Sequence, residues 1–327
     1  MRRWAAVCGK PIAHSLSPVL HRAAYRALRL DWSYEARECG ADGLAALLAG
    51  ARDDPSWAGF SLTMPLKTPV LPQLDEVDPL AAAVGAVNTV VPAGPAGPAG
   101  PPAGPAVPAG PAGPVRPPGP ARLVGFNTDV AGMQAALDEA GVRKAGPTVI
   151  LGAGGTAQAA LAALAGLGQR NPVVALRDRA RAGALLDAAH RLGVAPEVVA
   201  WPALDALLQA DLVISTVPAG AADGLAHELA RLSGPRAQVD ELGPAGGGRS
   251  GPAGTRGGWP ARTCLFDVVY SPWPTDLAAV AGASGAVVIG GLDLLVHQAV
   301  RQVELMTGRM VAPSVLRAAG QAAIRHR

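Results

Sequence analysis

Short apolar runs alternate along this chain with longer stretches in which apolar residues recur at helical spacing. These are the periods of a buried β-strand and of an α-helix that covers it. The clearest pair lies in the middle, where the apolar run 148–151 meets a glycine cluster and then an Ala/Leu-rich segment without a breaker until Gly166. This order predicts a strand, a tight turn and a helix. Further strands are predicted at 4–9, 33–37, 57–62, 86–91, 123–126, 173–176, 198–200, 211–217, 264–270 and 286–289.

Helical patterns fill most of the intervals between these strands. Such alternation is typical of an α/β fold with doubly wound parallel sheets, and we expect two of them. At 327 residues the chain suits two domains and can bury a full core. We expect an N-terminal α/β domain and a Rossmann-like doubly wound domain. Helices are predicted at 18–30, from 42, at 79–84, 127–140, 155–166, 179–192 and 223–232, from 275, at 292–306 and from 313.

Side chains that can cap a helix stand at several of these starts. Ser17 is followed by Pro18, which predicts an N-cap with proline at the first helical position. Asp42 and Asp78 are predicted to cap the two helices that follow them. Helix capping and turn formation would be enough to explain why serine stands at positions 15 and 17, without any role in binding.

Residues 92–121 break the pattern. Pro, Ala and Gly recur there irregularly, without the strict every-third glycine of collagen. This composition is typical of a solvated segment biased toward polyproline II, with no core of its own. Because a strand pattern resumes at 123–126 and could pair with 86–91, we interpret the segment as an enlarged hairpin loop. A second Gly/Pro-rich patch spans 243–258.

Composition narrows the function classes. Half of the residues are hydrophobic and only 4% are aromatic, so the core is aliphatic. A net charge of +3 with scattered arginines gives no reason to expect a nucleic-acid partner. The first apolar run ends at Lys10, and no run approaches the ~18 residues of a membrane helix, so we expect neither a signal peptide nor a membrane span. The cysteines, distant and in no C-x-x-C pair, indicate reduced thiols in a cytoplasmic protein and no metal site: Cys8, Cys39 and Cys264.

The glycine turn carries the first candidate chemistry. Gly152, Gly154 and Ala157 fit G-x-G-x-x-G/A, in which backbone N–H groups at a helix N-terminus contact a pyrophosphate. A Cβ at the glycines would hold the phosphate away from these groups. The match alone fits a glycine turn in any α/β domain, but the flanking strand and helix favour the cofactor. No H-E-x-x-H, G-x-S-x-G or Walker-type pattern supports metalloprotease, serine hydrolase or P-loop chemistry.

The end of the next predicted strand bears on which dinucleotide binds. Arginine at this place pairs with the 2′-phosphate of NADP, whereas an acidic residue accepts from the ribose 2′-hydroxyl of NAD. The chain has both, since Asp178 stands between Arg177 and Arg181. The two arginines, four positions apart, could clamp a phosphate together. The alternative is that both arginines are solvated side chains at the start of a helix and bind no phosphate.

A series of short motifs gives the chain a family resemblance. The motifs are Ser15-Leu16-Ser17-Pro18, Leu62-Thr63-Met64-Pro65-Leu66-Lys67, Gly85-Ala86-Val87-Asn88-Thr89, Asn127-Thr128-Asp129, the glycine turn, Tyr270, and Gly291 with Gln298-Ala299. In this order they resemble shikimate dehydrogenase, from about residue 7 to the C-terminus apart from the two inserts. A lone loop lysine such as Lys67 is usually solvated, so its role depends on this resemblance.

The resemblance implies a role for each of these positions. Lys67 and Asp129 would be the catalytic pair, and Tyr270 would line the site near the substrate carboxylate. The residues implied to hold shikimate are Ser15, Ser17, Thr63, Lys67, Asn88, Asp129, Tyr270 and Gln298. Those implied to hold the cofactor are Gly152, Gly154, Gly155, Thr156, Ala157, Arg177, Arg181, Thr216 and Gly291. The implied domains are 1–129 with 291–327 for substrate and catalysis, and 130–290 for NADP(H).

The implied activity is the reversible, NADPH-dependent reduction of 3-dehydroshikimate to shikimate, a step of aromatic amino acid biosynthesis, in a cytoplasmic monomer or homodimer. A lysine held by a carboxylate can supply the proton that the new hydroxyl needs. Two positions depart from the family pattern: Ser61 stands where Asn is frequent, and Asp178 where NADP-using members often have Thr. The alternatives are an NAD-dependent quinate/shikimate dehydrogenase and a non-catalytic small-molecule sensor on the same fold. The intact Lys67 and Asp129 disfavour the sensor.

Overall fold

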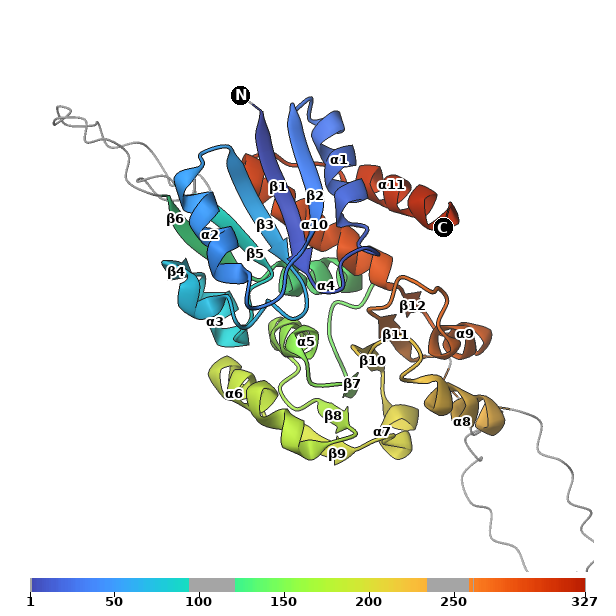
Figure 1. Ribbon diagram of the computed structural model, residues 1–327. Helices are drawn as coiled ribbons and strands as arrows, with labels where there is room; N and C mark the ends of the chain where they lie inside the picture. Colours follow the sequence, from blue (N-terminus) through green and yellow to red (C-terminus); the bar gives the residue numbers. More distant parts are fainter. Residues whose placement is uncertain (1, 94–120, 234–258, 261, 327) are drawn as a thin grey trace, which may run out of the picture.

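Two six-stranded sheets organise the chain into two lobes, one above the other in Figure 1. The computed structural model describes residues 2–93, 121–233, 259–260 and 262–326. Most of the segment 92–121 and all of the patch 243–258 therefore lie outside the described residues. Buried apolar side chains form separate clusters on the two faces of each sheet, because alternate residues of a strand point to opposite sides.

The first sheet has the strand order β2-β1-β3-β5-β6-β4. The strands are β1 (Arg3–Gly9), β2 (Trp32–Glu38), β3 (Trp57–Leu62), β4 (Glu76–Val77), β5 (Thr89–Ala93) and β6 (Arg122–Phe126). β1 is parallel to β2 and β3, but β5 is antiparallel to β3 and β6, so the expectation of a parallel sheet is wrong for this lobe. The predicted hairpin of β5 and β6 is the reason, and it is confirmed. Its register ends with Ala93 opposite Arg122, so residues 92 and 93 belong to the strand and not to the insert.

Helices from both ends of the chain cover this first sheet. α1 (Ser17–Ala27), α10 (Gly291–Thr307) and α11 (Pro313–Arg325) lie on one face, where the first and last helices are neighbours in Figure 1. α2 (Leu44–Asp53) and α3 (Pro79–Val84) contribute to the core of the other face. The C-terminal helices thus return to the N-terminal lobe.

The second sheet is parallel throughout, in the order β12-β11-β10-β7-β8-β9. β7 (Thr148–Leu151) lies near its centre and leads through the glycine turn into α5 (Gly155–Gly166), as predicted. Strands are added on both sides of β7, so this lobe is doubly wound, as expected. The remaining elements are β8 (Val173–Leu176), η2 (Arg179–Ala182), α6 (Gly183–Leu192), β9 (Glu197–Ala200), α7 (Leu204–Gln209), β10 (Leu212–Ser215), α8 (Asp223–Ser233), β11 (Cys264–Asp267), α9 (Asp276–Ala283) and β12 (Val288–Ile289).

One helix, α4 (Thr128–Glu139), connects the lobes and packs against both α10 and α5. Its contact with α10 is close at Gly132, where a Cβ would lie 3.0 Å from the backbone nitrogen of Gln298. The side chain of Asn127 caps α4 by accepting from the backbone N–H of Asp129 at 3.1 Å. These contacts bring Asp129 and Gln298 to the same part of the first lobe.

The predicted helix starts are only partly confirmed. Asp78 caps α3 and accepts from the first-turn N–H groups, as predicted. The cap at Ser17 is wrong by one residue: Leu16 is the N-cap, because its carbonyl accepts the first helical bond, from Leu20. The cap at Asp42 is also wrong, since α2 begins at Leu44. The pattern missed β4, α7 and the 3₁₀ turn η1 (Leu71–Gln73), which are too short to show a period.

Candidate active site

Lys67 and Asp129 form a partly buried ion pair where the lobes meet. Nζ lies 2.6 Å from Oδ2, and the side chains are 18% and 4% exposed. Lys67 stands in the loop after β3, which the fully buried Leu66 and Val70 anchor to the core. Asp129 stands in the first turn of α4, where the helix dipole stabilises a carboxylate. The structure therefore brings together two residues that are 62 positions apart in sequence.

Asn88 and Gln298 complete a hydrogen-bonded group with this pair. Asn88 Nδ2 donates to Asp129 Oδ1 at 2.8 Å and to Gln298 Oε1 at 3.2 Å. On its other side, Asn88 Oδ1 accepts from the backbone N–H of Thr128 at 2.8 Å. Since only an oxygen can accept from that N–H group, the amino group must face Asp129. One oxygen of the Asp129 carboxylate is thus bound to Asn88, and the other to Lys67.

The remaining predicted substrate residues lie at the ends of other elements. The hydroxyl of Tyr270 donates to the backbone carbonyl of His14 at 3.3 Å, beside the loop that carries Ser15 and Ser17. Ser15 Oγ accepts from the backbone N–H of Ser17 at 3.3 Å, so these two residues form the turn into α1. Thr63 directly follows β3, four residues before Lys67 in the same loop.

The glycine turn after β7 has the tight geometry that its sequence predicted. Gly152 has φ +105°, which favours glycine, and a Cβ there would lie 2.7 Å from Thr216 Oγ1. The hydroxyl of Thr216 donates to the backbone carbonyl of Leu151 at 2.8 Å. Thr216 therefore supports the turn from the end of β10.

The N-terminus of α5 fits an anionic ligand. Gly154 is the N-cap and has no side chain to accept from the first-turn N–H groups of Gly155, Thr156 and Ala157. A Cβ at Gly154 would meet no atom within 4 Å, so the backbone faces open space. Because the N–H groups and the helix dipole both favour negative charge, this turn can hold the pyrophosphate of a dinucleotide.

At Gly291 the glycine is explained by a close backbone crossing. A Cβ there would lie 2.1 Å from the carbonyl oxygen of Val268, and Gly291 N donates to Val269 O at 3.1 Å. The start of α10 therefore packs directly on the loop after β11, and any larger side chain would push that loop away.

Two charged residues after β8, Arg177 and Asp178, form hydrogen bonds within the protein, whereas Arg181 lies exposed in η2. The guanidinium of Arg177 donates to the backbone carbonyl of Ala221 and lies over the Trp201 ring, 5.3 Å from its centroid. Asp178 caps η2, since its Oδ1 accepts from the backbone N–H of Ala180 at 3.0 Å. A cap of this kind turns the carboxylate toward the backbone of its own turn.

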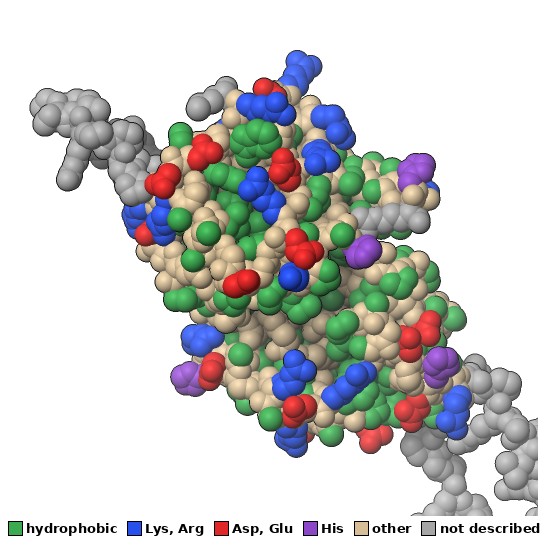
Figure 2. All heavy atoms as spheres, viewed as in Figure 1, with side chains coloured by type: hydrophobic (Ala, Val, Ile, Leu, Met, Phe, Trp, Pro, Cys, Tyr) green, Lys and Arg blue, Asp and Glu red, His purple; other side chains and the backbone are tan. Residues whose placement is uncertain are grey.

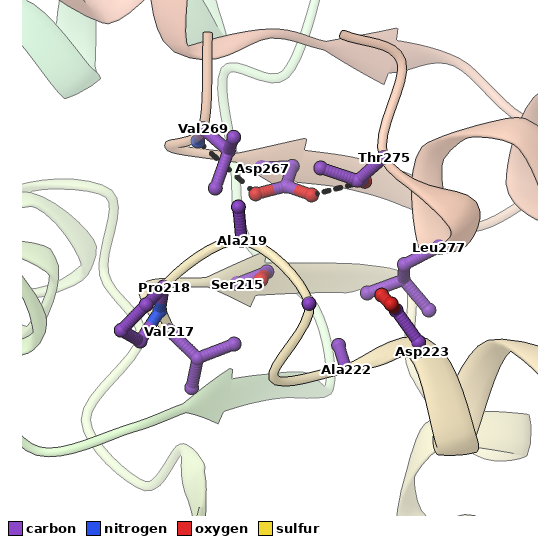
Figure 3. Close-up of a pocket in the computed structure, with 11 residues that line it drawn as sticks. Ser215, Val217, Pro218, Ala219, Ala222, Asp223, Asp267, Val269, Thr275 and Leu277 are labelled. Atoms are coloured by element: carbon purple, nitrogen blue, oxygen red, sulfur yellow. Dashed lines mark hydrogen bonds between the residues drawn. The ribbon is translucent and has the colours of Figure 1, made fainter. Parts of the chain in front are cut away.

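The loop after β11 is held by the buried Asp267 (Figure 3). Its Oδ2 accepts from Thr275 Oγ1 at 2.7 Å, and its Oδ1 accepts from the backbone N–H of Val269 at 3.2 Å. Asp267 is 2% exposed, and burial raises the pKa of its carboxyl above the ordinary value in spite of these donors. A cavity of about 10 Å³, about the space of one water, lies beside it. Asp267 thus fixes the loop that carries Tyr270.

The described part of the chain gives little support for a metal site, a membrane-spanning helix or a cysteine nucleophile. No group of three or more His, Cys, Asp or Glu side chains there could hold a metal ion, and none of its helices is long and apolar enough to span a bilayer. The cysteines are free thiols, and burial raises the pKa of Cys8 to about 12, which makes it a poor nucleophile. On the face in Figure 2, acidic and basic side chains are interspersed over both lobes.

Parts of the chain match known family models. Residues 7–90 match the shikimate dehydrogenase substrate binding domain, and residues 291–319 match the shikimate 5′-dehydrogenase C-terminal domain. Over 308 residues the chain is 34% identical to a shikimate dehydrogenase (NADP(+)) of Oleidesulfovibrio alaskensis, covering 94% of this chain and 91% of that protein. The chain belongs to the shikimate dehydrogenase family.

Solved structures of shikimate dehydrogenases share the whole fold. The Mycobacterium tuberculosis enzyme is 36% identical with a TM-score of 0.73, and the match covers 98% of this chain and 99% of that one. The Thermus thermophilus enzyme, solved in complex with NADP(H) and shikimate, is 30% identical with a TM-score of 0.71, again over 98% and 99%. The family resemblance and the two-lobed α/β fold expected from the sequence are confirmed.

The structure adds residues that the sequence did not single out. Gln302 is buried in α10 and contacts the hydroxyls of Thr89 and Thr128, which in turn contact Asn88. Its position four residues after Gln298 was a visible signal, because residues at this spacing share a helix face. Ser61, which departs from the family pattern, points to the same place, and its Oγ donates to Gln302 Oε1 at 2.9 Å.

Proposed function

We propose that this chain catalyses the reversible, NADP-dependent oxidation of shikimate to 3-dehydroshikimate. The observation that carries the proposal is the position of the Lys67–Asp129 pair beside the start of α5. A Cβ on Gly155 would lie 3.8 Å from Lys67 Cδ, so a group able to exchange a proton adjoins a turn able to hold a dinucleotide. The relatives named as NADP(+) shikimate dehydrogenases support the same reaction.

In this proposal one lobe binds the substrate and the other binds the cofactor. Residues 1–129 with 291–327 bind the substrate, and residues 130–290 bind NADP(H). The substrate is a cyclohexene acid with several hydroxyl groups, so it needs many hydrogen-bonding side chains at fixed positions. The proposed substrate contacts are Ser15, Ser17, Thr63, Lys67, Asn88, Asp129, Tyr270 and Gln298.

Lys67 is the proposed acid and base. In the reductive direction its ammonium group donates a proton from Nζ to the oxygen of the 3-keto group as that oxygen becomes a hydroxyl. In the oxidative direction the neutral amine takes the proton back. Asp129 holds Nζ at 2.6 Å and stabilises its charge, and the bond from Asn88 keeps the carboxylate in the orientation that does so. NADPH, when bound, supplies the hydride that accompanies this proton.

The proposed cofactor contacts lie on the second lobe and at the start of α10. The first-turn N–H groups of α5 would hold the pyrophosphate. Arg181, together with Arg177, would pair with the 2′-phosphate, because guanidinium groups form strong charge-assisted bonds with phosphate. The carboxylate of Asp178 accepts a hydrogen bond from the backbone of η2, which makes it less available to accept from a ribose 2′-hydroxyl. The full set is Gly152, Gly154, Gly155, Thr156, Ala157, Arg177, Arg181, Thr216 and Gly291.

We place the enzyme in the cytoplasm as a monomer or homodimer. The free thiols of all three cysteines support a reducing compartment. Size-exclusion chromatography with light scattering distinguishes a monomer or dimer from a higher assembly.

Turnover of shikimate tests the proposed function. The purified chain should produce NADPH absorbance when mixed with shikimate and NADP⁺, and consume it when mixed with 3-dehydroshikimate and NADPH. If the protein is folded by circular dichroism but shows no turnover in either direction, the proposed function is contradicted and the non-catalytic sensor is favoured.

A further inference from the structure

A buried amide, Gln302, lies behind the catalytic pair. Its side chain is 3% exposed and stands one helical turn after Gln298 on the same face of α10. Its Nε2 lies 3.2 Å from Thr89 Oγ1 and 3.3 Å from Thr128 Oγ1. The reaction as proposed above assigns no role to this residue.

The amide fixes the direction of two hydroxyl protons. A hydroxyl has one proton to donate and can also accept, whereas an amide NH₂ group only donates. The two protons of Gln302 Nε2 therefore occupy acceptor positions on Thr89 and Thr128, and each hydroxyl proton is left for another acceptor. Both hydroxyls donate to Asn88 Oδ1, at 2.9 Å from Thr89 and 3.0 Å from Thr128.

These bonds hold Asn88 in one of its two orientations. With its oxygen bound by the two hydroxyls, Asn88 directs its amino group at Asp129 Oδ1, 2.8 Å away. The reversed amide would instead place its oxygen against the carboxylate of Asp129, an arrangement in which two acceptors repel each other. The correct orientation leaves Asp129 Oδ2 for Lys67.

We propose that Gln302 is a positioning residue that acts through the two threonines on Asn88, and so on the catalytic pair. The role rests on the proposed function of that pair. An amide does not readily take up and pass on a proton, so this series of bonds sets geometry and is not a proton path.

Groups on the far side keep Gln302 itself in place. Its Oε1 accepts from Ser61 Oγ at 2.9 Å, and Ser61 in turn accepts from the Tyr34 hydroxyl at 2.6 Å. His21 Nε2 lies 3.0 Å from the same Oε1. Burial lowers the pKa of His21 to about 4, so near neutral pH the ring is uncharged and donates from Nε2. Because donors occupy Oε1, Nε2 must face the threonines.

Steady-state kinetics of the full-length chain test the positioning role. Gln302→Met keeps the volume of the side chain but has no donor. We expect kcat with shikimate and NADP⁺ to fall about tenfold, the size of effect that slight misplacement of reacting groups produces, with KM for NADP⁺ unchanged. A kcat within twofold of wild type would overturn the proposal.

Val303→Ala is the matched control. Val303 is the next residue of α10 and is fully buried in the core between α1, α10 and α11, where it makes no contact in the polar network. This variant should melt at a lower temperature than wild type but keep its kcat when assayed well below that temperature. An equal loss of kcat in Val303→Ala would mean that Gln302 is only structural.

A double-mutant cycle tests the route through Thr128. Thr128→Val removes the hydroxyl without changing the shape, and it should lower kcat about as much as Gln302→Met does. Thr128→Ser keeps the hydroxyl and should lose less. Because Thr89 still connects Gln302 to Asn88 in Thr128→Val, the double variant should be slower than either single variant, but by less than the product of the two single losses. Multiplied losses would contradict that route.

A further readout needs no turnover. The side-chain NH₂ protons of Asn88 should exchange slowly with solvent in the ¹⁵N-labelled wild type, and distinctly faster in Gln302→Met. Equal exchange rates would contradict the positioning role, whatever the enzyme does to shikimate. Failure of the wild type to oxidise shikimate, with the exchange difference present, would instead contradict the proposed function alone.

Discussion

Gly155 and Lys67 face each other across the boundary of the two lobes: a Cβ on Gly155 would come 3.8 Å from Lys67 Cδ. Gly155 begins α5, the helix after the glycine turn of the second sheet, and Lys67 belongs to a loop of the first sheet. The turn that suits a phosphate and the lysine that suits proton transfer thus adjoin each other, although they come from different lobes. Neither lobe alone contains the proposed reaction.

Replacing Lys67 tests the chemistry of the pair. Lys67→Ala should lower kcat by about 10²–10⁴, the usual contribution of general acid–base catalysis, with a smaller effect on the KM for shikimate. Lys10→Ala is the control, since the side chain of Lys10 is exposed and its Nζ lies 3.8 Å from Glu38 Oε1 in a surface ion pair. A Lys67→Ala enzyme within about twofold of wild type would remove the lysine from the mechanism.

A single methyl group at Gly154 should separate folding from cofactor binding. The glycine has φ −74°, and a Cβ there meets no protein atom within 4 Å, so Gly154→Ala should change the free energy of unfolding by less than about 1 kcal/mol. The KM for NADP⁺ should rise roughly tenfold or more, because the methyl group would occupy the space of a pyrophosphate. Gly183→Ala, at an equally open helix start, should leave the KM for NADP⁺ unchanged. A normal KM in Gly154→Ala would place the cofactor elsewhere.

The residues after β8 should set cofactor preference. Arg181→Ala and Arg177→Ala should each raise the KM for NADPH roughly tenfold while leaving the KM for shikimate nearly unchanged. Arg179→Ala is the matched control, because it removes the same charge from the same segment at a residue outside the proposed cofactor contacts, whose guanidinium donates to the carbonyl of Val198. Asp178→Thr should widen the preference for NADP, since it removes a negative charge and keeps a residue able to cap η2. A preference that moves toward NAD in this variant would contradict the role of the arginines.

His21 should make stability depend on pH below neutrality. Burial lowers its pKa from 6.5 to about 4, so the unfolded chain binds more protons than the folded chain between these values. The neutral ring of His21 makes its full contribution to the free energy of unfolding above about pH 6.5. As the pH falls toward 4 this contribution is lost, and the total loss is on the order of 3 kcal/mol. Urea unfolding at a series of pH values should therefore give a flatter curve for His21→Gln than for wild type. Equal slopes for wild type and His21→Gln would contradict this prediction.

Much of the fold follows from local pattern. The strand, turn and helix around Gly152 were predicted because apolar runs, glycines and an unbroken helical segment all indicate the same structure. Asp78 was predicted correctly as a cap, but Asp42 was not, because a capping residue in the sequence does not say which nearby carbonyl accepts the first helical bond. The hairpin of β5 and β6 was predicted, but the antiparallel pairing of β5 with β3 was missed, since the order and direction of strands depend on the connections and not on the apolar pattern of each strand.

The site is less visible in the sequence. Lys67 and Asp129 could be paired in advance only through the family resemblance, because spacing along the chain says nothing about contact across 62 residues. Arg177 forms a tertiary hydrogen bond, and the bond of Asp178 depends on the exact start of η2. The charges in the sequence could not show that these side chains have partners within the protein. Gln302 was missed because a polar residue in a helix is usually solvated.

The central claim is most directly tested by one set of initial rates, with shikimate or quinate as substrate and NADP⁺ or NAD⁺ as cofactor. The relatives named as NADP(+) shikimate dehydrogenases and the arginines after β8 predict that kcat/KM is highest for shikimate with NADP⁺. Quinate should be a poor substrate with either cofactor, and NAD⁺ should be the weaker oxidant of shikimate. A higher kcat/KM with NAD⁺, or equal values for the two acids, would contradict this account and favour a quinate/shikimate dehydrogenase that uses NAD.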